Sequence, residues 1–185
     1  MKVKLEEVFE KTVAVLNKEK FPYIVIGGIA AGTLGEPRMT MDIDVDILLS
    51  LKDVSYLLGR LKKSGFSVNK KRCLKTARDT GIFQITYAGL GVDFIITSTD
   101  FEREALRRRI AVTLYGIKTY LPTPEDLILL KIIPARPQDL LDAERVAIRH
   151  KAKLDLEYLN SWAQKLSDEA QDIRIWNELK RILAL

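Results

Sequence analysis

Three aspartates alternate with apolar residues in residues 41–50, MDIDVDILLS. In a strand, Asp42, Asp44 and Asp46 would share one face, with about 6.5–7 Å between successive α-carbons. Like charges on one face repel each other, and burying them is costly. A divalent cation resolves that cost, because Mg²⁺ prefers carboxylate and phosphate oxygens, and two such ions can hold the attacking and leaving oxygens of a phosphoryl transfer. The alternative is an edge strand whose acidic face is solvated.

Two further features place phosphate chemistry near these aspartates. The segment YIVIGG is an apolar run that ends in Gly27 and Gly28, which predicts a buried strand followed by a helix. Backbone amides of glycines at a helix start can meet a phosphate with no side chain in the way. Asp93 lies in GVDFIIT, a later apolar strand. Together these residues predict a metal-dependent nucleotidyl-transfer site.

Other phosphate and metal motifs do not fit the sequence. Residues 42–53 begin like a calcium-binding loop, but Ile47 replaces the required glycine and Asp53 replaces the bidentate glutamate. The glycine spacing from Gly27 to Gly32 resembles a P-loop, but Thr33 stands where the lysine is needed. The GxGxxG dinucleotide fingerprint is absent.

The surrounding segments predict mixed strands and helices up to about residue 120, followed by helices alone. Residues 82–88 and 91–97 are predicted as a hairpin joined at GLG, with residues 66–68 as another strand and residues 111–121 as a strand or hairpin. Thr99 with Glu102 forms a capping-box pattern, and Thr123 precedes Pro124 as a helix start. The basic segment NKKRCLKTARD, residues 69–79, is predicted as a non-helical connection. It is either a solvated loop or a contact for a phosphate or an acceptor.

Composition limits the class of protein. At 185 residues with 47% hydrophobic and 30% charged residues, the sequence is typical of one globular domain, or of one domain with a helical appendage. It lacks a signal-peptide core and an apolar run of membrane-spanning length. The chain has one cysteine, Cys73, which excludes an internal disulfide, so we expect a cytoplasmic protein. It has one histidine, His150, which excludes a histidine-based metal cluster. The net charge of +5 favours an anionic partner such as a nucleotide, phosphate or RNA, unless the basic surface has no specific partner.

With these motifs, the sequence resembles the DNA polymerase β-type nucleotidyltransferase superfamily. It looks more narrowly like the minimal nucleotidyltransferases and the AbiEii-type toxin group, through GG…RMTMDIDV, VDFI and TPEDLILLK…RPQDLLD, over roughly residues 20–145. The resemblance implies an α+β polymerase β-like core, a short twisted mixed sheet with flanking helices, in residues 1–120. Helices alone are expected in residues 121–185.

The resemblance also implies a role for each matched residue. Asp42, Asp44 and Asp93 would be both the metal ligands and the catalytic carboxylates, with Asp93 helping to deprotonate the acceptor. The implied nucleotide-binding residues are Gly27 and Gly28 around the triphosphate, Arg38 and Thr40 at the phosphates or the strand entrance, and Lys131 at a phosphate or the base. Asp46 would support the ligands or be solvated. For Arg38 the alternative is a salt bridge to a strand aspartate, and for Asp142 it is a structural role.

The implied activity is transfer of a nucleoside monophosphate from an NTP to a hydroxyl with release of pyrophosphate, dependent on Mg²⁺ or Mn²⁺. The acceptor stays open among tRNA, a protein side chain and a small molecule, the last as in aminoglycoside adenylation. The alternative is a non-catalytic nucleotide-binding or antitoxin-like module on the same fold. The expected partners are NTP, an RNA or protein acceptor and a cognate antitoxin, without a membrane. The base, the acceptor and the oligomeric state are not predicted.

Overall fold

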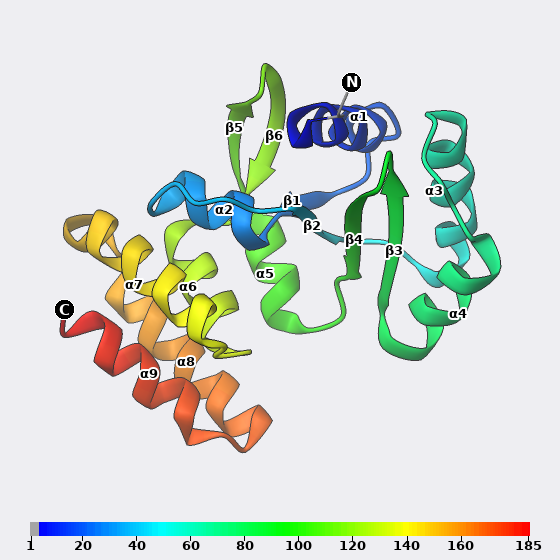
Figure 1. Cartoon of the computed structure of the whole chain (residues 1–185). Helices are drawn as coiled ribbons and strands as arrows, with labels where there is room; N and C mark the ends of the chain where they lie inside the picture. The colour runs from blue at the N-terminus through cyan, green and yellow to red at the C-terminus, as the bar shows by residue number, and fades with distance from the viewer. Residues whose placement is uncertain (1–3) are drawn as a thin grey trace. The chain divides into compact units, whose positions relative to one another are not determined.

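The computed structural model of the protein describes residues 4–185 (Figure 1). The chain divides into two compact units. The first unit contains the described chain up to Ile29 together with Met39–Leu121. The second contains Ala30–Arg38 and Pro122–Leu185, so a short early segment is counted with the C-terminal helices. The expected domains, 1–120 and 121–185, stay a prediction.

The first unit contains a small mixed sheet, which confirms the expected α+β class. Its strands, in the spatial order β1-β2-β4-β3, are β1 (Tyr23–Val25), β2 (Asp42–Ile47), β4 (Leu90–Ile96) and β3 (Ile82–Tyr87). β2 is antiparallel to β1 and parallel to β4, and β4 forms the expected hairpin with β3. The parallel pair matters most for the site, because it places Asp44 directly opposite Asp93.

The two faces of this sheet differ in character. One face carries buried apolar side chains, which are Val25, Ile43, Val45, Ile47, Phe83, Ile85, Val92 and Phe94. The helices α1 (Leu5–Lys18), α3 (Leu51–Lys63) and α4 (Lys70–Thr80) belong to the same unit, with α4 packed on β3 and α3 packed on both α4 and α1. The opposite face carries Asp42, Asp44 and Asp93. On that face Ile24 is buried, whereas Asp42 and Gln84 are exposed.

A second, two-stranded sheet and a capped helix complete the first unit. Residues 111–121 were predicted as a strand or a hairpin, and the structure shows a hairpin of β5 (Ile110–Leu114) and β6 (Ile117–Leu121). The side chain of Asn17 on α1 donates to the backbone oxygen of Lys118 at 2.8 Å, which fastens the hairpin. Helix α5 (Asp100–Arg108) begins with the predicted capping box.

The prediction of a loop at residues 69–79 is wrong, because the segment forms helix α4. Asn69 caps the helix by accepting a hydrogen bond from the backbone amide of Arg72 at 3.1 Å. Cys73 and Ala77, four residues apart, are buried, and Gly81 ends the helix in the left-handed conformation. The predicted strand at residues 66–68 is reduced to an isolated bridge between Ser67 and Thr86.

The second unit is helical. Helix α2 (Gly27–Leu34) begins in the first unit, and its residues from Ala30 onward are counted with the second. The other helices are α6 (Pro124–Ile132), α7 (Pro137–His150), the 3₁₀ turn η1 (Lys151–Lys153), α8 (Leu156–Ala170) and α9 (Ile173–Leu183). Within residues 4–185, none of the helices has the length and apolar character to cross a membrane.

The predicted helix start at Thr123 is confirmed and also joins two helices. The Thr123 side chain accepts from the backbone amide of Asp126 at 3.2 Å. The carboxylate of Asp126, which has no exposed surface, accepts from the hydroxyl groups of Thr123 and Tyr158. Glu125 accepts from the backbone amide of Asp155 at 3.1 Å. This motif therefore fastens the start of α6 to the start of α8.

Candidate functional site

The structure places the three predicted catalytic carboxylates on one face of two adjacent strands. Asp42 and Asp44 lie two residues apart on β2, and Asp93 lies on β4 in register with Asp44. Asp42 is exposed, whereas Asp44 and Asp93 are half-buried. The acidic face is therefore reachable from solvent at the start of β2.

The surroundings of Asp93 disfavour its ionised form. Partial burial raises the pKa of Asp93, and the negative charge of Asp42 raises it further. A hydrogen bond from the side chain of Gln84, which lies opposite Asp93 on β3, acts in the other direction. A carboxylate whose ionisation is disfavoured by a neighbouring negative charge is suited to bind a cation.

Gly27 is held by its conformation and by its contact with Asp44. Its φ is +64°, in the left-handed region that favours glycine. A Cβ added at Gly27 would lie 1.8 Å from Oδ2 of Asp44, so the carboxylate rests directly against the glycine backbone. The backbone amide of Ile26 donates to the backbone oxygen of Asp44 at 2.9 Å, which fixes the end of β1 beside β2. The phosphate-binding role of Gly27 and Gly28 stays a prediction, but the need for glycine at position 27 has a structural cause as well.

The donor set fits a divalent cation in type but does not form a finished metal site. Among residues 4–185, no three carboxylate, imidazole or thiol groups are arranged to hold one metal ion together. Asp44 lies against Gly27, whereas the charge of Asp42 acts on Asp93. Hard oxygen donors on one face, one of them with a raised pKa, are nevertheless the groups that bind Mg²⁺ or Mn²⁺. The metal role of the three aspartates therefore stays a prediction.

Asp46, the third aspartate of β2, is buried, so the expectation of a solvated side chain is wrong. It is 1% exposed, and its carboxylate accepts from the hydroxyl of Thr97 at 2.7 Å. Burial raises the pKa of Asp46 to about 7, and the charge of Glu102 adds to the effect. The acidic strand thus runs from an exposed carboxylate at Asp42 to a buried, partly protonated one at Asp46.

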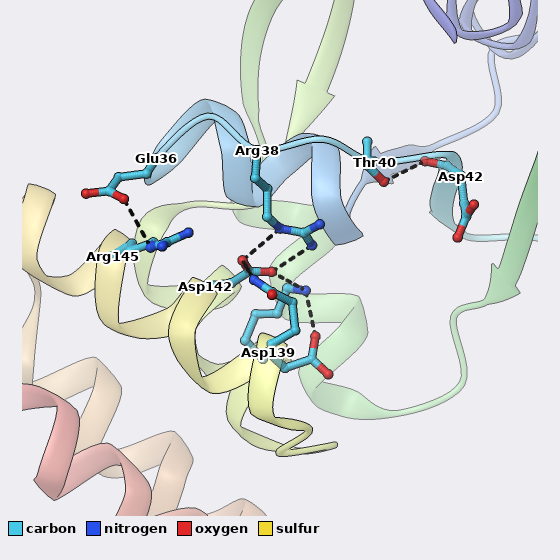
Figure 2. A network of polar contacts seen from close by, with 9 residues as sticks. Glu36, Arg38, Thr40, Asp42, Asp139, Asp142 and Arg145 are labelled. Carbon is cyan, nitrogen blue, oxygen red and sulfur yellow. Dashed lines mark hydrogen bonds and ion pairs between the residues drawn. The ribbon is translucent and has the colours of Figure 1, made fainter.

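Thr40 supports the strand that carries the aspartates. Its hydroxyl donates to the backbone oxygen of Asp42 at 3.4 Å, as Figure 2 shows. This contact agrees with a role at the strand entrance, whereas a contact to phosphate stays a prediction. The methionines on either side, Met39 and Met41, are 88% and 64% exposed.

Arg38 and Lys131, the other predicted nucleotide contacts, lie together in the second unit. Arg38 holds Asp142 through two hydrogen bonds of 2.9 Å (Figure 2). The Lys131 ammonium lies 2.7 Å from Asp139 and 3.1 Å from Asp142, and Gln138 also donates to Asp142. Burial alone would raise the pKa of Asp142, but hydrogen bonds from Arg38, Gln138 and Lys131 outweigh it and lower the pKa. We call Arg38, Lys131, Asp139 and Asp142 the ion-pair cluster.

The ion-pair cluster bears on two alternatives from the sequence. Arg38 pairs with Asp142 on a helix, and its expected salt bridge to a strand aspartate stays a prediction. Asp142 is 2% exposed and takes a structural role at the centre of the cluster. The roles of Arg38 and Lys131 at a nucleotide stay predictions.

Sequence reasoning missed Gln84 and Thr97, which contact the acidic face. The sequence could have indicated Gln84, because a hairpin with a two-residue turn between residues 87 and 90 pairs Gln84 with Asp93. Thr97 directly follows β4. It reaches Asp46 on β2 because these two strands pair in parallel, which the sequence alone does not show.

The fold is similar to solved structures of other proteins at low sequence identity. The solution structure of the antibiotic-resistance factor ANT(2'')-Ia covers 92% of this chain and 97% of its own, with a TM-score of 0.64 and 14% identity. The match to the lincosamide antibiotic adenylyltransferase LnuA covers 79% of this chain and 98% of LnuA, with a TM-score of 0.54 and 13% identity. The match to an antigenic nucleotidyltransferase-like protein from Paracoccidioides brasiliensis covers 95% of this chain and 92% of that protein, with a TM-score of 0.54 and 18% identity. At these identities the likeness shows the fold alone.

The sequence itself matches a family model over nearly its whole length. The model, described as a nucleotidyltransferase of unknown function (DUF6036), matches residues 3–183. A comparison with curated proteins gave no match.

Proposed function

Because the chain belongs to the DUF6036 nucleotidyltransferase family and is thus a transferase of phosphorus-containing groups, we propose that it moves a nucleoside monophosphate from an NTP to a hydroxyl acceptor. The observation that carries this proposal is the register of β2 and β4, which places Asp44 opposite Asp93 with Asp42 on the same face. This face lies beside Gly27, at the start of a helix. The combination supplies carboxylates for a divalent cation and backbone amides for phosphate.

In the proposed reaction, the acceptor oxygen forms a bond to the α-phosphorus while the bond to the β-phosphate oxygen breaks, and pyrophosphate leaves. Asp42, Asp44 and Asp93 would hold Mg²⁺ or Mn²⁺, which supplies positive charge for the phosphates. Asp93 would accept the proton of the acceptor hydroxyl as a general base. The backbone amides of Gly27 and Gly28 would bind phosphate oxygens.

Two cations of the ion-pair cluster also belong to the proposal. Arg38 and Lys131 are proposed to contact the phosphates or the base, as the sequence resemblance implies. Asp142 contacts both cations and would act as their positioning residue. Lys131 is only 7% exposed, so its position is determined by its partners rather than by solvent.

Two acceptor classes have specific support. Two structural neighbours have antibiotic ligands, LnuA with lincomycin and ANT(2'')-Ia with adenylyl-2''-tobramycin, which favours a small-molecule hydroxyl. The positive net charge favours an RNA. A protein acceptor, a cognate antitoxin and a cytoplasmic location are proposed from the sequence resemblance alone.

The proposal is tested by following the label of each α-phosphate-labelled NTP. The protein is incubated with Mg²⁺ and total tRNA, a cell lysate or an aminoglycoside, and pyrophosphate release is measured in parallel. We expect label transfer to one acceptor class, and loss of transfer by orders of magnitude in Asp42→Asn and Asp93→Asn. If the protein binds NTP but releases no pyrophosphate with any acceptor, the non-catalytic alternative replaces the transferase proposal.

A further inference from the structure

Helix α4 carries an exposed stripe of positive charge. Lys71, Lys75 and Arg78 follow one another at helical spacing, on the side opposite the buried Cys73 and Ala77. Residues at i, i+4 and i+7 line one face of a helix. The exposed cations of this helix are Lys70, Lys71, Arg72, Lys75 and Arg78.

These cations lack the ion pairs that are formed on helix α5 of the same unit. Within the part of the chain that the structure describes, none of the five cations of α4 forms an ion pair. On α5, by contrast, Arg103 pairs with Asp100 at 2.7 Å and Arg107 pairs with Glu104 at 2.6 Å. Basic helices of the same unit therefore differ in whether their charges are paired within the protein.

The cations in the first half of α4 are placed where they oppose helix formation, whereas Arg78 lies in the last turn, where a cation is favourable. Lys70, Lys71 and Arg72 occupy the first turn, which contains no acid, although a helix N-terminus favours negative charge. Lys71 and Lys75 repel each other across one turn. Folding therefore does not explain the stripe, and a partner with negative charge does.

The helix next to α4 also carries exposed cations, and α4 itself is bonded to the strand next to the one that carries Asp93. Lys62 and Lys63 are exposed at the end of α3, which packs on α4. The thiol of Cys73 donates to the backbone oxygen of Gln84 at 3.3 Å, which fastens α4 to β3 (Figure 1). β3 is the edge strand of the sheet, and its neighbour β4 carries Asp93.

We propose that the exposed face of α4 binds the phosphate backbone of an RNA acceptor, an inference that rests on the transferase function proposed above. A polymer can extend from α4 around the strand edge toward Asp93, whereas a small acceptor has no use for a cationic helix. Regularly spaced lysine and arginine side chains suit a phosphate backbone. A membrane-surface helix would expose large apolar side chains beside its cations, but Cys73 and Ala77 of α4 face the sheet and are buried.

The binding experiment measures the affinity of the full chain for a fluorescently labelled 20-nucleotide RNA by anisotropy, over a range of salt concentrations. The test variant is Lys71→Gln/Lys75→Gln/Arg78→Gln. The matched control is Lys151→Gln/Lys153→Gln/Lys165→Gln, which removes the same net charge from the second unit. We expect at least about a tenfold loss of affinity in the test variant, a salt slope that is lower by about 2, and less than a twofold loss in the control.

Several results would overturn the inference. Equal losses in the test and control variants would mean that net charge alone attracts RNA. Binding of the parent to phosphatidylserine vesicles but not to RNA would assign the stripe to membranes instead. Far-UV circular dichroism must show that the test variant remains folded, and the double variant Lys71→Gln/Lys75→Gln is measured if it does not.

Two readouts separate this inference from the transferase proposal. The test variant should bind NTP as the parent does, whereas Asp44→Asn should bind RNA as the parent does. If the test variant keeps full RNA affinity, the α4 surface is wrong while the transferase proposal stands. If the parent binds RNA through α4 but never releases pyrophosphate, the surface stands and the RNA is a ligand rather than an acceptor.

Discussion

The acidic face of the sheet and the ion-pair cluster of the second unit both gather charged groups, but in opposite ways. In the cluster, two cations and two carboxylates are arranged so that Asp142 contacts both Arg38 and Lys131. On the acidic face, carboxylates lie together, and the charge of Asp42 disfavours ionisation of Asp93. Removing one partner of a balanced, buried ion pair leaves an unpaired charge and destabilises a fold, whereas like charges on one face cost stability unless a ligand neutralises them. The difference therefore separates a region whose charges are matched within the protein from one whose charges favour a bound cation.

The largest expected effect is on the ion-pair cluster. Asp142→Ala would leave Lys131 and Arg38 short of their shared partner, so we expect a loss of about 3–5 kcal/mol in the free energy of unfolding. The measurement is urea unfolding at neutral pH. Asp100→Ala is the control, because it removes an exposed ion pair with Arg103 and should cost less than about 1 kcal/mol. Equal losses would show that the cluster is no more structural than a surface pair.

The second prediction concerns the contact between Gly27 and Asp44. Gly27→Ala adds a Cβ in the left-handed region and against the Asp44 carboxylate, so we expect a loss of about 1–3 kcal/mol in unfolding free energy. The control is Gly59→Ala, which meets open space in the middle of α3 and should stabilise by about 0.5–1 kcal/mol. Gly27→Ala should also weaken NTP binding, measured by calorimetry. If it binds NTP like the parent protein, the phosphate role of Gly27 is wrong.

The third prediction uses pH to contrast Asp46 with Asp142. The pKa of Asp46 is raised to about 7, so the folded state binds more protons than the unfolded state between about pH 4 and 7, and stability falls as pH rises through that range. Asp142 has a lowered pKa, so its contribution is present above about pH 4 and is lost as pH falls. Relative to the parent, Asp46→Asn should gain on the order of 2 kcal/mol between pH 5 and 8 by urea unfolding. A constant difference between the two proteins would refute the raised pKa.

The smallest expected effect on stability is that of Asp44→Asn. The substitution keeps the shape of the side chain against Gly27 and removes one of the like charges on the face. We expect the unfolding free energy to change by less than about 1 kcal/mol, or to rise. Thermal melting without added metal checks this. A loss as large as that of Asp142→Ala would place Asp44 with the structural carboxylates.

The features of the fold and of the site that depend on neighbouring residues could be predicted from the sequence, whereas those that depend on contacts between distant residues could not. Alternation along β2 placed three aspartates on one face, and the threonines at positions 99 and 123 marked helix starts, because both signals act within a few residues. The partner of Arg38 lies 104 residues away, and the contact of Asp44 with Gly27 depends on how β2 pairs with β1. Helix α4 was not predicted because most of its residues are charged. Two features nevertheless indicate a helix, the capping residue Asn69 and the four-residue spacing of the buried Cys73 and Ala77.

The most direct test of the central claim compares two substitutions on one strand. The rate of labelled-nucleotide transfer is measured for Asp44→Asn and Asp46→Asn under the conditions that support transfer by the parent protein. Both substitutions remove one aspartate from the same face of β2, but only Asp44 lies opposite Asp93. We predict a rate lower by orders of magnitude for Asp44→Asn and a rate within a few fold of the parent for Asp46→Asn. Equal rates in the two variants would contradict the assignment of the acidic face as the transfer site.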